Sequence, residues 1–506
     1  MKKVGNIVKK VFGFFLIIIL LIFSTISMII YNLVEWILDT WGLLSMDEIV
    51  FHLKVPLEGT NKDMIIDAIN YCIPMAVVVL FIIIIILISI RERKKLGVLI
   101  SFSLIVFFCC LDVFSVEKLW KELDVDKYIE AQKKESTFIQ DNYVDPRNVS
   151  LEFPEEKRNI IYIYLESMET TYMSKEVGGG FQENVIPELT QIAESNISFS
   201  NTDKLGGAYP TVGSTWTMGA MFTQSTGMPL KTDNEITLRN EYIESEKAIF
   251  PSVYSIGDVL NDAGYKQVLL IGSDGSFAGR RNFFEQHGDY EVIDYNIIKN
   301  QGLIPEDYYV WWGFEDEKLF SFAKNELVEL ASSEKPFNFT LLTVDTHFED
   351  GYVCGLCKND YDNQYSNVMA CSSRQVYEFI NWIQQQDFYQ NTTIVLVGDH
   401  LTMDSDFCQN VDKDYQRTVY NAFINSVVTT ENIHNRKFTT LDMFPTTLAS
   451  MGVKIKGERL GLGVNLFSDE ETLAEQFGLK KLDNKLQENS NFYNQLIDIK
   501  NFEKTK

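Results

Sequence analysis

Basic residues are scarce in this chain. Among its 506 residues, Lys and Arg total 45 against 70 Asp and Glu, which gives a formal net charge of −25 at pH 7. Proteins that bind nucleic acids neutralise phosphates with clustered Lys and Arg. The composition therefore argues against a nucleic-acid partner. The acidic excess indicates mostly a solvated surface, with some carboxylates left for metal binding.

The sequence has no internal repeat and no low-complexity segment, and its apolar residues are spread unevenly. They concentrate in the first 115 residues, whereas the rest has the composition of a soluble domain of roughly 350 residues, ample for a large core. We therefore expect a membrane domain over 1–115, linker helices over 116–158, a large folded domain over 159–475 and a C-terminal helical tail over 476–506.

Three apolar stretches near the N-terminus are each close to the ~20 residues that cross a bilayer core. They cover Val11–Val34, Ile73–Ile90 and Leu96–Phe114. Basic residues precede the first stretch and join the second to the third, and such residues stay on the cytoplasmic side. We therefore predict three membrane helices, an N-terminus inside, and an extracytoplasmic location for the 36–71 loop and for everything after residue 115.

Cysteines are also few, and they divide into two groups. Cys72, Cys109 and Cys110 lie in or beside the apolar stretches, and we interpret them as packing residues. Cys354, Cys357, Cys371 and Cys408 lie in the large domain, where an oxidising environment permits disulfides. Sequence leaves the pairing open. We hypothesise a Cys357–Cys371 bridge, with Cys354 as the alternative partner; the lack of a matching Cys/His pair at metal spacing argues against zinc.

Short β-branched and aromatic runs alternate with helical patterns in the large domain. We expect strands at 159–167, 267–272, 337–345 and 392–400, and helices at 252–264 and 372–386. Alternation of this kind favours an α/β fold, with a central, mainly parallel sheet between helices.

Three of the expected strands end in polar groups, and open α/β sheets bind ligands at the carboxyl ends of their strands. Glu166 and Ser167 follow the first strand, Asp345, Thr346 and His347 end or follow the third, and Asp399 and His400 end the last. Carboxylate and imidazole ligands suit divalent zinc or manganese. The chain has only five histidines, and two of them follow expected strands close to an Asp. This is more than chance placement would give, and it favours a metal site.

A hydroxyl nucleophile is offered by residues 206–230, a Gly/Thr/Ser-rich loop that turns apolar. From Thr217 the pattern predicts a short helix stopped by Gly227. A hydroxyl at a helix N-terminus beside a cation is well placed to attack phosphate. Capping of the helix by Thr217 is the alternative interpretation.

Four ordered motifs in residues 155–470 resemble those of the phosphoglycerol transferase family. They are NIIYIYLES, WTMGAM with TGMPL, VDTHFEDG and VGDHLTM. That family acts on osmoregulated periplasmic glucans, is related to lipoteichoic acid synthases, and belongs to the alkaline-phosphatase/sulfatase superfamily. The resemblance implies that a sulfatase-like catalytic domain follows the membrane helices predicted from the apolar stretches.

The resemblance also implies roles for individual residues. Glu166, Asp399 and His400 match ligands of one divalent metal, usually manganese, with zinc or magnesium as alternatives. Thr217 matches the nucleophile and fourth ligand, ten residues before Gly227. The chain lacks the Gly-Lys-Thr-Ser-Asp pattern of lipoteichoic acid synthases, which leaves Thr215 and Ser214 as rival nucleophiles.

Two further residues match substrate-binding positions of the family. His347 matches a histidine that contacts the phosphoglycerol group or assists proton transfer, and Arg280 a basic residue that holds phosphate, with Arg281 as its alternative. The activity implied is transfer of phosphoglycerol from phosphatidylglycerol to a glycan or glycolipid outside the bacterial cell membrane. A phosphoethanolamine transferase or a sulfatase-type phosphodiesterase is the alternative, although the chain lacks the Cys/Ser-x-Pro-x-Arg setting of sulfatases.

Overall fold

The computed structural model describes the chain except for residues 1, 55–58, 60, 232–249 and 498–506. It divides into two compact units. One comprises Met1–Gly42 and Asn61–Lys127, and the other comprises Leu43–Thr60 and Tyr128–Lys506. The segment Leu43–Thr60, which lies between the first two apolar stretches in the sequence, therefore belongs to the second unit.

The first unit consists of three long helices, α1 (Lys2–Thr40), α3 (Lys62–Ser89) and α4 (Lys94–Glu122), and α1 packs against both others. By length and composition each could cross a membrane, and the described residues hold three such helices. Their outward sides are apolar; Val98, for example, is 72% exposed. An exposed surface of this kind fits lipid rather than water. The apolar segments within the helices are Gly13–Thr40, Met64–Ser89 and Lys95–Glu122.

The second unit is built on a six-stranded sheet in the order β4-β3-β5-β2-β6-β7. Neighbouring strands are parallel except β7, which runs antiparallel to β6 at one edge. The strands of this sheet are almost entirely buried, as expected for a sheet covered on both faces. They are β2 (Asn159–Leu165), β3 (Lys266–Ile271), β4 (Glu291–Ile293), β5 (Phe337–Leu342), β6 (Thr392–Gly398) and β7 (Asn421–Ile424).

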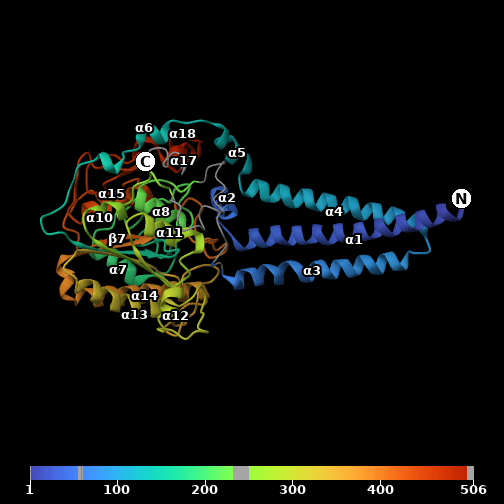
Figure 1. Ribbon diagram of the computed structural model, residues 1–506, viewed down its shortest axis with the longest axis horizontal. Coiled ribbons are helices and arrows are strands. Elements are labelled where there is room, and N and C mark those ends of the chain that lie inside the picture. The colour runs from blue at the N-terminus through green and yellow to red at the C-terminus, as the bar shows by residue number, and fades with distance from the viewer. Residues whose placement is uncertain (1, 55–58, 60, 232–249, 498–506) are drawn as a thin grey trace. The chain divides into compact units, whose positions relative to one another are not determined.

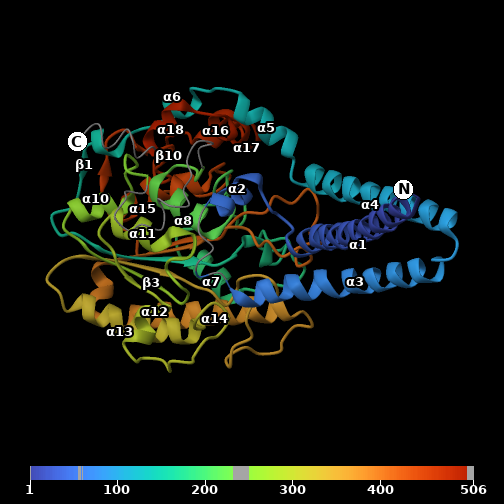
Figure 2. The same ribbon diagram turned by 45° about the vertical axis from the view of Figure 1, so that its right-hand side comes forward.

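Helices cover both faces of this sheet (Figures 1 and 2). On one face lie α7 (Pro187–Ser195), α12 (Tyr295–Asn300), α13 (Asp316–Ala331) and α14 (Gln364–Gln384), whose apolar residues form one core with Ile161, Leu341 and Leu396 of the strands. On the other face lie α8 (Thr217–Thr226), α10 (Ile256–Asp262), α11 (Arg280–Gln286) and α15 (Met443–Ser450). The α/β fold with a mainly parallel central sheet is thus confirmed.

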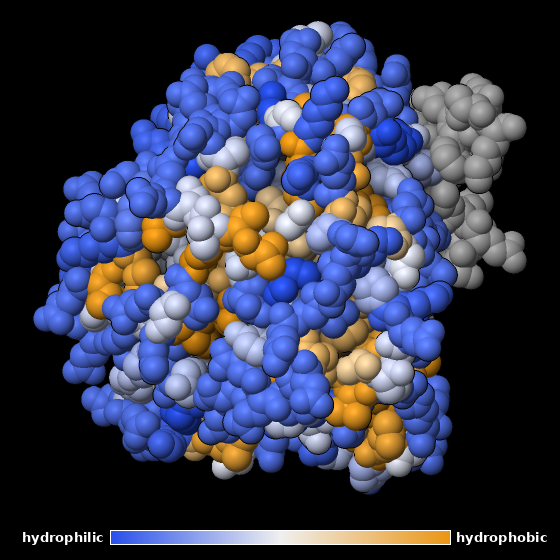
Figure 3. All heavy atoms as spheres, turned by 90° about the vertical axis from the view of Figure 1, so that its left-hand side faces the viewer, coloured by the Kyte–Doolittle hydropathy of each residue, from blue (hydrophilic) through white to orange (hydrophobic). Residues whose placement is uncertain are grey.

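Smaller elements complete the second unit, and the face seen in Figure 3 is covered largely by hydrophilic residues, in keeping with the acidic composition. The two-stranded sheets are β1 (Leu151–Glu152) with β8 (Lys454–Ile455), and β9 (Arg459–Leu460) with β10 (Gly463–Val464). The remaining helices of the large domain and its flanks are α5 (Val125–Lys133), α6 (Phe138–Asn142), α16 (Leu473–Phe477), α17 (Leu479–Gln487) and α18 (Asn491–Ile497). Within the expected C-terminal tail, residues 498–506 lie outside the described residues.

Candidate active site

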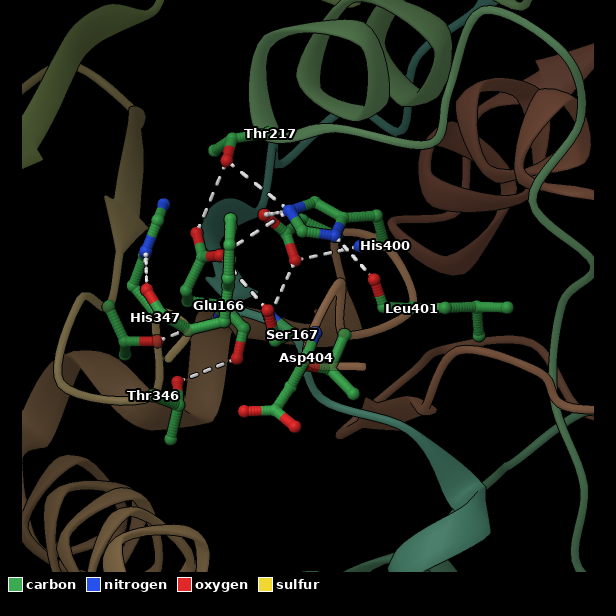
Figure 4. Close-up of polar contacts among 12 residues, drawn as sticks. Glu166, Ser167, Thr217, Thr346, His347, His400, Leu401 and Asp404 are labelled. Atoms are coloured by element: carbon green, nitrogen blue, oxygen red, sulfur yellow. Dashed lines mark hydrogen bonds and ion pairs between the residues drawn. The ribbon is translucent and has the colours of Figure 1, made fainter. Parts of the chain in front are cut away.

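Three of the predicted ligands meet at the carboxyl edge of the sheet, and Figure 4 labels two of them, Glu166 and His400. Glu166 follows β2, and Asp399 and His400 follow β6; the two strands are neighbours in a register that pairs Leu165 with Gly398. One donor atom from each side chain lies within 4.8 Å of the others. All three side chains are buried, with at most 2% of each residue exposed. The parallel register therefore brings together residues more than 230 positions apart.

Backbone groups hold the Asp399 carboxylate in place. Its Oδ1 accepts hydrogen bonds from the N–H of Ser167 at 2.8 Å and of His400 at 2.7 Å. Ser167 has a left-handed backbone with φ of 53°, a strained conformation that turns the chain sharply after β2. The other oxygen, Oδ2, is buried and accepts no hydrogen bond from the described residues. One oxygen is thus fixed by the fold, and the other is left for a ligand.

The imidazole of His400 is oriented by its neighbour. Nδ1 lies 2.7 Å from the carbonyl of Leu401 and donates to it, which turns Nε2 toward the two carboxylates. Nε2 lies 3.3 Å from Oε1 of Glu166 and 3.4 Å from Oδ2 of Asp399. A metal-binding histidine is commonly fixed in this way, with its other ring nitrogen bonded to a carbonyl.

Burial and mutual charge shift the pKa of each of the three groups. Burial raises the pKa of Asp399, and the nearby charge of Glu166 raises it further. Burial alone would lower the pKa of His400, but the two carboxylates raise it to about 10. Two carboxylates in one dry site repel each other unless a positive charge lies between them. The donor set, the burial and the Oδ2 of Asp399, which accepts no hydrogen bond from the described residues, all fit a divalent cation.

Thr217 supplies a hydroxyl directly above this cluster (Figure 4). Its Oγ1 donates to Oε2 of Glu166 at 3.3 Å and lies 3.4 Å from Nε2 of His400. Thr217 is the first residue of α8, whereas the N-cap position is held by Trp216, and within the described part of the chain no side-chain hydrogen bond caps this helix end. The capping interpretation of Thr217 is therefore wrong. Gly227 ends the helix with φ of 66°, as the sequence predicts.

The two rival hydroxyls have other partners. Ser214 is fully buried, and its Oγ donates to the carbonyl of Thr211 at 2.8 Å. Oγ1 of Thr215 lies 3.3 Å from Oγ of Ser45. Neither contact involves the ligand cluster, so the geometry favours Thr217 over Thr215 and Ser214 as the reacting hydroxyl.

A pocket beside the cluster contains the two predicted substrate-binding residues. Arg280 is buried, and its guanidinium donates to the carbonyls of Phe277 at 3.1 Å and Asp274 at 3.0 Å. Burial lowers the pKa of Arg280 to about 10, so it remains charged at neutral pH. Arg281 instead pairs with Asp294 at 2.8 Å. The pocket is lined by Glu166, Thr217, Gly272, Ser273, Phe277, Arg280, Trp312, Leu342, Thr343, Val344 and His347.

His347 lies on the wall of this pocket. Its Nδ1 lies 2.7 Å from the carbonyl of Phe348 and donates to it, and its ring packs on Trp312 with 4.7 Å between centroids. Burial lowers the pKa of His347, so the ring is neutral at pH 7 with a lone pair on Nε2. The neighbouring Asp345 is not part of the cluster: its Oδ1 accepts from the N–H of Asp316 at 3.1 Å.

Sequence reasoning missed a helix beside this site. α2 (Met46–Lys54) belongs to the 36–71 loop, yet its side chains pack in the second unit. Phe51 is fully buried with its ring 5.6 Å from that of Trp216, the residue before Thr217. His52 stacks on Phe277 of the pocket wall at 6.0 Å. The available signal was Ser45, whose Oγ accepts from the N–H of Glu48 at 3.2 Å and starts the helix.

Burial shifts the pKa of Glu48 further than that of Asp47 or His52, the other titratable residues of α2 with a shifted pKa. Glu48 is 4% exposed, and its Oε2 has no hydrogen-bond partner among the described residues. Burial raises the pKa of Glu48 to about 8, partly offset by the charge of His400. α2 therefore places a buried carboxyl group within electrostatic range of the ligand cluster.

Fold and site together define an open α/β domain with a polar centre at the carboxyl edge of its sheet. The chain belongs to the sulfatase family, whose model, described as Sulfatase, matches residues 158–453. The recognition from sequence motifs is thereby confirmed.

The chain is also similar to curated proteins that carry a name. The chain is 27% identical over 457 residues to "Phosphoglycerol transferase I" of Xanthomonas campestris pv. campestris (strain B100), which covers 87% of this chain and 61% of that protein. It is 30% identical over 273 residues to the protein of the same name in Escherichia coli O6:K15:H31, covering 53% of this chain and 34% of that protein. The chain thus spans about three fifths or less of these relatives.

Two solved structures are also similar to this chain. One is the lipoteichoic acid synthase LtaP from Listeria monocytogenes, with 18% identity, a TM-score of 0.49, and coverage of 65% of this chain and 81% of that one. The other is the lipooligosaccharide phosphoethanolamine transferase A from Neisseria meningitidis, with 12% identity, a TM-score of 0.49, and coverage of 85% and 83%.

Proposed function

We propose that this chain is a membrane-bound phosphoglycerol transferase. It takes the phosphoglycerol group from phosphatidylglycerol and transfers it to a glycan or glycolipid outside the bacterial cell membrane. The observation that carries the proposal is the position of Thr217, whose hydroxyl lies against Glu166 and His400 at the mouth of a pocket that also holds Arg280 and His347. The relatives named phosphoglycerol transferase support this choice of headgroup.

Glu166, Asp399, His400 and Thr217 are the residues that would hold one divalent metal, for which we propose Mn²⁺, with Zn²⁺ or Mg²⁺ as alternatives. Their fit is supported by the donor set and by the buried Oδ2 of Asp399, which lacks a partner among the described residues. When bound, the metal would stabilise the deprotonated hydroxyl and the negative phosphoryl oxygens.

The residues of the chain then carry out two displacements. Oγ1 of Thr217 attacks phosphorus, the bond from phosphorus to the diacylglycerol oxygen breaks, and a glycerophospho-threonine forms. An acceptor hydroxyl next attacks phosphorus, and the bond to Thr217 breaks. In the first step the proton lost by Oγ1 of Thr217 ends on the diacylglycerol oxygen, and in the second step the acceptor hydroxyl gives its proton back to Oγ1 of Thr217. A neutral imidazole that accepts a proton and passes it on can therefore serve both steps. Nε2 of His347 is the atom we propose for this, because Nδ1 is held by Phe348.

Arg280 would orient the donor. Its guanidinium is buried at the pocket wall, and it donates hydrogen bonds to the backbone carbonyls of Phe277 and Asp274. A planar guanidinium can hold two phosphate oxygens at once. We propose that it binds the phosphate of the donor while Thr217 attacks.

The membrane helices give the donor a physical setting, because phosphatidylglycerol stays in the bilayer. We propose three spans, with the N-terminus in the cytoplasm and the sulfatase-like domain outside. The proposal rests on the basic residues Lys2, Lys3, Lys9 and Lys10 and on the turn Arg91–Lys95. A reporter that works only outside the cytoplasm should be active when fused after Glu130, and a reporter that works only in the cytoplasm should be inactive there. The opposite result would refute the proposed topology.

The function is tested with phosphatidylglycerol labelled in its headgroup glycerol. The full-length protein in detergent should release diacylglycerol and carry the label on the peptide that contains Thr217. Label transferred from phosphatidylethanolamine instead would identify a phosphoethanolamine transferase. Release of free glycerophosphate at the same rate with and without a glycan acceptor would identify a hydrolase.

A further inference from the structure

A second group of potential metal ligands lies outside the candidate active site. The sulfur of Cys354 is 3.7 Å from that of Cys357 and 3.7 Å from that of Cys371. All three sulfurs lie within 4.8 Å of one another. The seven cysteines of the chain are all free, so the hypothesised Cys357–Cys371 bridge is not formed, and Cys354 is equally near both partners.

Two local structures bring these sulfurs together. Residues Cys354 to Cys357 form a tight turn, closed by the N–H of Cys357 donating to the carbonyl of Cys354 at 3.2 Å. Cys371 comes from α14, which begins at Gln364, eight residues earlier than the sequence predicts, because Asn363 caps it by accepting from the N–H of Ser366 at 2.9 Å. The helix thereby includes Cys371 and turns it toward the loop.

The surroundings suit thiolates. Gln375, one helical turn after Cys371, directs its amide nitrogen at two of the sulfurs, at 3.6 Å from Cys371 and 3.8 Å from Cys354. Cys354 and Cys371 are 5% and 2% exposed, whereas Cys357 is only partly buried. Two ligands are therefore shielded, and the third borders solvent.

We propose that Cys354, Cys357 and Cys371 bind one Zn²⁺ ion, with a water molecule as the fourth ligand on the side of Cys357. Zinc–thiolate bonds of about 2.3 Å in a tetrahedron place the sulfurs about 3.8 Å apart. The sulfur separations of 3.7 Å match that edge. A disulfide instead needs about 2.05 Å and joins only two of three equivalent sulfurs.

The position of the ligands explains what such an ion would do. The turn at Cys354 follows β5 and lies seven residues after His347, while Cys371 belongs to α14. The ion would tie the loop that carries His347 to a helix of the core. This consequence rests on the proposed function, whereas zinc binding itself does not.

The test is metal content of the full-length protein, purified in detergent without reductant or chelator. Wild type should hold one zinc ion more per chain than either the Cys371→Ser or the Cys357→Ser variant. Cys357→Ser should disturb the fold less, because Cys357 is only half-buried. Cys408→Ser is the matched control: Cys408 lies outside the three-sulfur group, and its replacement should leave zinc content unchanged.

Two further measurements separate this ion from one at the candidate active site. Asp399→Asn should keep the thiolate-bound zinc, and Asp399→Asn with Cys371→Ser should lose it. Cobalt-loaded protein should show a thiolate-to-cobalt charge-transfer band that disappears in Cys357→Ser. A disulfide among the three cysteines in wild type, or a zinc content and cobalt spectrum unaffected by both cysteine variants, overturns the proposal. Loss of diacylglycerol release alone would instead concern the proposed function.

Discussion

Asp399 offers the sharpest test of the proposed metal site, because its two oxygens make different contacts. Oδ1 accepts two backbone hydrogen bonds, from Ser167 and His400, and Oδ2 has no hydrogen-bond partner among the described residues. Asp399→Asn keeps an acceptor oxygen for both N–H groups and replaces only the free oxygen with an amide nitrogen. Asp399→Ala removes both oxygens. The pair of variants therefore separates the support of the fold from the binding of metal.

The expected stabilities follow from these contacts. A hydrogen bond to a charged group contributes about 1.5–3 kcal/mol, so loss of both should cost Asp399→Ala about 3–6 kcal/mol in unfolding free energy. Asp399→Asn should lose much less stability than Asp399→Ala in metal-free protein, because it keeps both hydrogen bonds and because the lost repulsion from Glu166 offsets the lost attraction to His400. Both variants should bind no metal at this site and release no diacylglycerol.

Three assays check this: unfolding of chelator-treated protein, manganese content after equilibration with Mn²⁺, and diacylglycerol release. Asp399→Asn with wild-type manganese content and turnover would show that Oδ2 is not a ligand. An Asp399→Asn variant that unfolds as readily as Asp399→Ala would refute the claim that Oδ1 supports the fold while Oδ2 binds the metal.

Three other predictions test neighbouring residues. Thr217→Ala should fold but lose diacylglycerol release and the labelled peptide, while Thr217→Ser keeps partial activity because the hydroxyl remains; wild-type rates in Thr217→Ala would end its role as nucleophile. Arg280→Lys should raise KM for phosphatidylglycerol about tenfold by losing two-pronged contact, whereas Arg281→Lys, whose partner is Asp294, should not; equal effects would remove Arg280 from donor binding. Phe51→Ala, a buried ring on α2, should expose residues 43–54 to proteases and slow turnover, whereas Leu53→Ala, 65% exposed, should change neither; matching digestion patterns in both variants would refute α2 docking.

Much of the fold follows from the sequence because buried parallel strands need continuous apolar runs. The runs at 159–167 and 392–400 mark β2 and β6, and they end two residues beyond each strand. Glu166, Asp399 and His400 were found for the same reason, since a polar residue directly after such a run must lie at the carboxyl edge of the sheet. The prediction of Thr217 as nucleophile rests instead on the family resemblance, which places that residue ten positions before the glycine that ends its helix, here Gly227.

Other features depend on contacts that no local pattern records. The expected helix at 372–386 begins instead at Gln364, because the side chain of Asn363 caps a polar stretch that looks like loop. The three sulfurs meet only because that longer helix turns Cys371 toward the Cys354–Cys357 turn. Spacing along the chain could not reveal this, since the third ligand comes from a different element than the other two.

The helix α2 shows that charged residues in a sequence need not be exposed in the structure. Asp47 and Glu48 look like a solvated face between two apolar stretches, yet both are at most 5% exposed. Burial raises the pKa of Asp47 to about 6, with Lys231 partly opposing the shift, and raises that of Glu48 to about 8. Carboxyl groups are rarely buried without a compensating positive charge. Lys231 supplies a positive charge that lowers the pKa of Asp47. For Glu48 the charge that lowers the pKa is that of His400, in the candidate site. The helix α2 is therefore better understood as a buried part of the second unit than as an exposed connection.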